Sequence, residues 1–142
     1  MLFSHIISSR VEYVQTDKMQ VMHNSQYFLY FEKGRTETMR QLAISYKEIE
    51  EKGIIMPLIE QHCKYILPAY YDDVLLIETI IDEIPYSKFS FQYNIYREEK
   101  GGERTLISTG WNTLAFVSKS NNKPVRCPMW ILELLNKKLG TK

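Results

Sequence analysis

The first residues of the chain alternate between apolar and polar side chains. Phe3, Ile7, Val11 and Tyr13 fall on one side of an extended chain, and Ser8, Arg10 and Glu12 fall on the other. A period of two is typical of a strand with one buried face. The pattern therefore predicts a half-buried strand over residues 3–13.

A long helix is predicted next. Apolar and aromatic residues recur at helical spacing from Tyr27 to Leu42, and Asn24 or Ser25 is a suitable N-cap. We expect the helix to end at about Ala43. Gly34 lies in its middle, where glycine costs close to 1 kcal/mol relative to alanine, so we expect that face to press closely on a sheet.

The second half of the chain has the pattern of strands. Residues 46–52 predict a short exposed helical turn ended by Gly53, and strands are predicted over residues 58–67, 74–84, 89–98 and 104–118. Gly101 and Gly102 lie in a hairpin turn between the last two strands, and Pro128 opens a short C-terminal helix.

The order of elements is one strand, one long helix and then four strands. Hairpin-length connections favour an antiparallel sheet, so we predict an α+β fold and a single domain over residues 1–142. A five- to six-stranded sheet wrapped around one long central helix is the hot-dog arrangement. Its outer face and edges usually need a partner subunit.

Composition excludes several functions. The 142 residues are 44% apolar with a formal net charge of +1, which gives no basic surface for nucleic acid. No apolar run approaches the ~18 residues that a membrane span needs, and residues 1–10 lack the features of a signal peptide. Cys63 and Cys127 are isolated, so we expect free buried thiols and a cytoplasmic protein. Ten tyrosines favour pockets and subunit interfaces.

Most rival catalytic patterns are poorly supported. Three scattered histidines and two lone cysteines do not supply a zinc site, so no metal is expected. His62 and Cys63 are adjacent on a predicted strand and point to opposite faces. Asp17 remains, in a loop that leads to the N-terminus of the long helix, where unpaired N–H groups suit a developing negative charge. The alternative is that Asp17 only caps a turn or pairs with a surface lysine.

The region from Val11 to Arg35 resembles the signature of the 4-hydroxybenzoyl-CoA thioesterase type of hot-dog protein. The similarity continues in residues 68–75 and 123–126, and so covers nearly the whole chain in order. The residues that carry it are Tyr13-Val14-Gln15-Thr16-Asp17, Val21-Met22-His23, Tyr27-Phe28-Leu29-Tyr30-Phe31 and Gly34-Arg35.

The resemblance implies a hydrolase that cleaves an acyl-CoA or acyl carrier protein thioester. It implies that Asp17 is the nucleophile or general base and that the main-chain N–H of Asn24 holds the oxyanion. His23, Tyr27 and Lys88 are the expected substrate-binding residues. No cofactor is implied, because coenzyme A is part of the substrate.

The resemblance also implies a homodimer or tetramer with the active site between subunits. Where the family usually has glycine three residues after the aspartate, this chain has Gln20, so a conformation that glycine adopts freely is expected to cost energy here. The alternative function is a non-catalytic acyl-binding or scaffold protein with the same fold.

Overall fold

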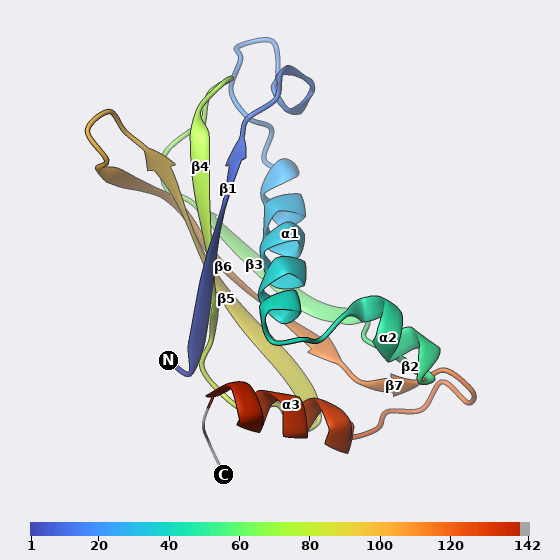
Figure 1. Ribbon diagram of the computed structural model, residues 1–142. Coiled ribbons are helices and arrows are strands. Elements are labelled where there is room, and N and C mark those ends of the chain that lie inside the picture. The colour runs from blue at the N-terminus through green and yellow to red at the C-terminus, as the bar shows by residue number, and fades with distance from the viewer. Residues whose placement is uncertain (140–142) are drawn as a thin grey trace.

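The computed structural model describes residues 1–139, and its main feature is a five-stranded antiparallel sheet in the order β1-β4-β5-β6-β3 (Figure 1). A two-stranded sheet of β2 and β7 lies beside it. The strands are β1 (Phe3–Arg10), β2 (Ile54–Ile55), β3 (Leu58–Tyr65), β4 (Val74–Ile81), β5 (Lys88–Glu98), β6 (Arg104–Ala115) and β7 (Val117–Ser118). The helices are η1 (Tyr13–Gln15), α1 (Gln26–Gln41), α2 (Tyr46–Glu51) and α3 (Met129–Leu139).

The sheet register shows which strand ends lie together at each end of the sheet. Phe3 pairs with Ile81 and Arg10 pairs with Val74, so the start of β1 lies at the end of β4. The start of β5, Lys88, pairs with Ala115 at the end of β6. Figure 1 shows the connection from β1 to α1 at one end of the sheet and α3 at the other. The predicted α+β fold with one long helix on a five-stranded sheet is confirmed.

Helix α1 packs along the inner face of the sheet (Figure 1). A Cβ atom added to Gly34 would lie 2.5 Å from Oγ1 of Thr79 and 2.9 Å from Cγ2 of Ile77, both on β4. The predicted close approach at Gly34 is confirmed. The buried face of the helix consists of Tyr27, Tyr30, Phe31, Gly34, Arg35, Thr38 and Met39.

The first predicted strand extends too far. It ends at Arg10, and Tyr13 begins the short helix η1 with 68% of its surface exposed. Val11 leaves the ladder because its N–H donates to the carbonyl of Asp73 and its carbonyl accepts from Asp72 N–H. The alternation continues past the strand end, so the pattern alone could not place that end.

Other boundaries differ by a few residues. Helix α1 ends at Gln41, since Ala43 has φ +63°, and the predicted strand 104–118 is two strands separated at Phe116. The strands predicted to reach residues 67 and 84 end at Tyr65 and Ile81. Helix α2 is confirmed and is followed by Gly53 at φ +84°.

Both cysteines are free thiols. Cys127 is buried and Cys63 is half-buried, with its Sγ 3.3 Å from Oγ of Ser108. The ring of His62 stacks on Trp111 on the other face of the sheet, so the predicted separation of His62 from Cys63 is confirmed. Within residues 1–139, no helix is long and apolar enough to cross a membrane.

Candidate active site

Asp17 lies at the start of a tight loop closed by an isolated β-bridge between Thr16 and Met22. Its N–H donates to the carbonyl of Val21 at 3.0 Å, and its own carbonyl accepts from Gln20 N–H at 3.0 Å. Oδ1 of Asp17 accepts from the backbone N–H groups of Met19 at 2.8 Å and Val21 at 3.2 Å. The interpretation that Asp17 caps a turn is therefore correct for one of its two carboxylate oxygens.

The other oxygen of Asp17 has different surroundings. Over residues 1–139, no hydrogen bond or ion pair engages Oδ2, and the side chain is exposed. Oδ1 holds the loop while Oδ2 is available for chemistry. The same carboxylate can thus serve a structural and a catalytic purpose.

Gln20 occupies the left-handed region of backbone space, with φ +64°. This is the conformation that glycine adopts without a steric cost and that other residues adopt at about 1–2 kcal/mol. The carbonyl of Gln20 accepts from Tyr71 N–H at 3.0 Å, which anchors the strained residue. The loop therefore keeps the conformation expected for the family's glycine.

The backbone that leads into α1 includes an unpaired donor. Ser25 is the N-cap, but its side chain accepts no helix N–H. Its own N–H donates to Nδ1 of His23 at 3.2 Å, so in neutral His23 the proton lies on Nε2. Nowhere in the described chain does the N–H of Asn24 have a hydrogen-bond acceptor. A free N–H at a helix N-terminus is a ready oxyanion donor.

A cavity of about 330 Å³ opens beside Asn24 and Tyr27. Tyr27 is buried, and its ring meets that of Tyr65 edge to face with centroids 4.9 Å apart. Burial raises the pKa of Tyr27. The remaining wall is mostly apolar and is formed by Val21, Met22, Ile66, Leu67 and Pro68.

Tyr65, the last residue of β3, holds the backbone just before α1. Its hydroxyl donates to the carbonyl of Asn24 at 3.0 Å. Desolvation, reinforced by the neighbouring Cys63 thiol, raises the pKa of Tyr65 to about 12. The phenol therefore stays protonated at neutral pH and keeps its hydrogen bond to the Asn24 carbonyl.

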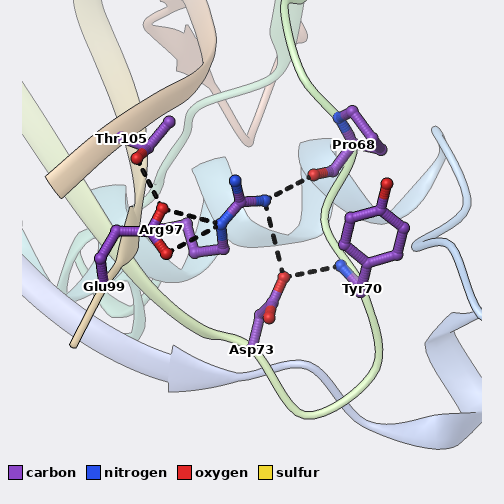
Figure 2. Close-up of polar contacts among 6 residues, drawn as sticks. All are labelled: Pro68, Tyr70, Asp73, Arg97, Glu99 and Thr105. Atoms are coloured by element: carbon purple, nitrogen blue, oxygen red, sulfur yellow. Dashed lines mark hydrogen bonds and ion pairs between the residues drawn. The ribbon is translucent and has the colours of Figure 1, made fainter.

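Segment 68–73 pairs with the Asp17 loop through backbone hydrogen bonds. Met22 N–H donates to the carbonyl of Ala69 at 2.8 Å, and Val21 forms an isolated bridge with Tyr70. Figure 2 shows Arg97 of β5 reaching this segment, with one guanidinium nitrogen 2.9 Å from the carbonyl oxygen of Pro68. Asp73 in turn accepts from Tyr70 N–H at 2.8 Å.

The predicted site residues do not all meet. Asn24 and Tyr27 line one cavity, His23 precedes Asn24, and Asp17 lies on the adjoining loop. Lys88 lies at the opposite end of the sheet, where it lines a separate cavity of about 320 Å³ with Tyr86. The chain alone therefore does not bring Lys88 to Asp17.

Three or more potential metal ligands gather nowhere in residues 1–139. The chemistry available at the candidate site is that of a carboxylate, a free backbone N–H and an apolar cavity. This set can attack or activate water against a carbonyl group and stabilise the resulting oxyanion.

Comparisons with known proteins identify the family of the chain. Residues 11–135 match the Thioesterase-like superfamily. The chain is 31% identical over 130 residues to the "Putative esterase" of Aquifex aeolicus, covering 92% of this chain and 96% of that one. It is 28% identical over 120 residues to the acyl-CoA thioesterase YbgC of Haemophilus influenzae, covering 84% and 85%.

A solved structure extends the comparison to the fold. The 4-hydroxybenzoyl-CoA thioesterase of Pseudomonas sp. strain CBS-3 superposes with a TM-score of 0.81, over 92% of this chain and 98% of that one. At 21% identity this similarity shows the fold alone. The chain therefore belongs to the thioesterase-like superfamily, with the hot-dog fold and the thioester-hydrolase class that its signature predicted.

Proposed function

We propose that the protein hydrolyses an acyl-CoA thioester at the mouth of the cavity beside Asn24 and Tyr27. The observation that carries the proposal is the unpaired N–H of Asn24 next to an apolar cavity, with the free Oδ2 of Asp17 on the adjoining loop. YbgC of H. influenzae is named for this activity. An acyl carrier protein thioester presents the same reacting bond and is the nearest alternative substrate.

The reaction needs few protein groups. The Asp17 carboxylate attacks the thioester carbonyl or removes a proton from an attacking water, and the carbonyl oxygen becomes negative. The N–H of Asn24 then donates to that oxygen. Coenzyme A departs as a thiolate, and the pKa near 8.5 of its thiol makes a strong general acid unnecessary. If Asp17 is the nucleophile, water then cleaves the Asp17–acyl anhydride, which releases the free acid and regenerates the carboxylate; if Asp17 is the base, it gives its proton to the departing thiolate.

Tyr27 and His23 have supporting roles in this proposal. Tyr27 forms the floor of the cavity beside the reacting carbonyl, held there by Tyr65. Nδ1 of His23 is occupied by Ser25, which leaves Nε2–H of the neutral ring as a donor for the substrate. Each contact would orient the acyl group rather than take part in bond cleavage.

We further propose that the active unit is a homodimer or a tetramer of dimers. Edge strand β3 is exposed along almost its whole length, and Ile59, Tyr65, Ile66 and Leu67 are each 42–46% exposed on it or just after it. A second subunit on this edge would cover them. In such an assembly, Lys88 of one subunit would bind a coenzyme A phosphate at the active site that contains Asp17 of another subunit.

The substitution Asp17→Asn tests the catalytic role. Asparagine keeps the oxygen that accepts from Met19 and Val21 N–H, so the loop should persist while the negative charge is lost. We expect free-thiol release from acyl-CoA to fall by at least ~10² with the fold intact. Asp17→Ala, which also loses both loop hydrogen bonds, is the matched comparison and should in addition be less stable.

The assay should use a panel of acyl-CoA esters together with an acylated carrier protein. Near-normal turnover by folded Asp17→Asn would show that Asp17 is not the catalytic group. If the wild-type protein binds acyl-CoA but releases no thiol from any ester, the protein is an acyl-binding or scaffold member of the family instead.

A further inference from the structure

Arg97 lies on β5 with only 19% of its side chain exposed, and it bonds in three directions (Figure 2). One guanidinium nitrogen donates to the Pro68 carbonyl at 2.9 Å and lies 3.8 Å from Oδ2 of Asp73. Nε lies 3.3 Å from Oε2 of Glu99. The guanidinium therefore connects the β5–β6 hairpin to segment 68–73.

Segment 68–73 in turn contacts the candidate active site at several points. The Ala69 carbonyl accepts from Met22 N–H, Tyr70 bridges Val21, and Tyr71 N–H donates to the Gln20 carbonyl. Tyr27 and Pro68 line the same cavity, and burial raises the pKa of Tyr27 while the nearby backbone of Ala69 lowers it. The segment thus lies between Arg97 on one side and both the Asp17 loop and Tyr27 on the other.

We propose that Arg97 is a positioning residue that holds the Asp17 loop and Tyr27 in place through segment 68–73. Arg97 lines neither the cavity beside Asn24 nor the Asp17 loop, so it acts through the segment and not on the substrate. The kinetic part of this proposal rests on the proposed thioesterase activity, and its structural part does not.

The contacts suit arginine better than lysine. A planar guanidinium presents donors in several fixed directions, so it can hold a carbonyl and two carboxylates at once, whereas an ammonium group is a single point charge. Glu99 is itself held in place, because its Oε2 accepts from Oγ1 of Thr105 at 2.6 Å. Asp73 is fixed by Tyr70 N–H. Both acidic partners of Arg97 are therefore held in place by other groups; we call Arg97 with Asp73, Glu99 and the Pro68 carbonyl the Arg97 clamp.

The test combines amide hydrogen exchange with kinetics on Arg97→Gln and Arg97→Lys. The informative amides are those of Met22 and Tyr71, which join the Asp17 loop to segment 68–73. In Arg97→Gln we expect their exchange to accelerate at least ~10-fold while central β4 and β5 amides stay unchanged, since local opening is independent of global unfolding. Arg97→Lys should lie between Arg97→Gln and wild type.

The kinetic expectation is a fall in kcat of about 10-fold with little change in KM, since a small misplacement of reacting groups affects the transition state more than binding. Arg104→Gln is the control, because Arg104 lies on the same hairpin and contacts Tyr96 but not the segment. It should leave both readouts at wild-type values.

Three results would overturn the proposal. If the Met22 and Tyr71 amides exchange at wild-type rates in folded Arg97→Gln, Arg97 does not hold the Asp17 loop through segment 68–73. Equal acceleration of all sheet amides would reduce Arg97 to a general stabilising role. A raised KM with unchanged kcat would mean that Arg97 binds substrate directly. If the wild type hydrolyses no thioester, the proposed function fails while the exchange experiment still decides the role of Arg97.

Discussion

Backbone and side chain of Asn24 have separate roles in the proposed mechanism. The N–H is unpaired at the cavity mouth, whereas the carbonyl is held by Tyr65. No hydrogen bond of the Asn24 side chain is found in the described chain, and Ser25, not Asn24, is the N-cap. We therefore expect the amide side chain at this position to be dispensable for both the helix and the oxyanion.

A pair of variants separates the two roles. Asn24→Ala keeps the N–H, so turnover should stay close to wild type and the free energy of unfolding should change by less than about 0.5 kcal/mol. Asn24→Pro removes the N–H, and the loss of one oxyanion donor typically lowers turnover about 10²–10³-fold. Proline also restrains His23, so the stability of both variants is measured by thermal unfolding.

Equal losses for the alanine and proline variants would assign the role to the Asn24 side chain. A folded Asn24→Pro protein with normal turnover would place the oxyanion donor elsewhere.

Individual site residues differed in how far the sequence could predict them. Asp17, Asn24 and Tyr27 belong to one short stretch, so its signature predicted their neighbourhood. Tyr65 and Arg97 were missed because their partners Asn24 and Pro68 are 41 and 29 residues away in the chain. Contacts at that separation depend on strand order and register, which no local pattern encodes.

At the scale of elements, the contact between α1 and β4 is set by one glycine. A Cβ at position 34 would lie within 3 Å of both Thr79 and Ile77. Oγ1 of Thr79 is buried, and no hydrogen-bond partner for it is found among the described residues. Even a methyl group at position 34 therefore forces these two side chains or the helix itself to move.

We expect Gly34→Ala to lower the free energy of unfolding by about 1–2 kcal/mol. An overpacking cost of about 1–3 kcal/mol exceeds the ~1 kcal/mol that alanine gains in a helix. Combining it with Thr79→Ala removes the nearer clash, so the double variant should be more stable than Gly34→Ala alone. Chemical denaturation of the single and double variants measures the difference; identical stabilities would show that Thr79 is not the obstacle.

The elements themselves were predicted better than their ends. Helical spacing placed α1, and period-two alternation or apolar runs placed the five long strands. Strand ends are set by where backbone groups find other partners, as Val11 does with Asp72 and Asp73. The small β2–β7 sheet was missed because each of its strands is two residues long, too short to show a period.

At the scale of the whole molecule, the two edges of the main sheet differ. Strand β1 packs against α1, while β3 on the other edge is exposed along almost its whole length. The cavity beside Asn24 is walled on one side by Tyr65, Ile66 and Leu67, each of which is 42–46% exposed. A cavity with so open a wall is suited to completion by a second subunit.

Two exposed isoleucines give a matched test of that association. Ile59 lies on β3 at 44% exposure, and Ile6 lies on β1 at 37%. If β3 is the interface, Ile59→Lys buries a charge there and should raise the dissociation constant at least ~10-fold, whereas Ile6→Lys should leave it unchanged. Light scattering over a dilution series measures the association, and specific activity should fall at the concentrations where the dimer dissociates. A stable 16.9 kDa monomer with full activity would contradict both the interface and the shared site.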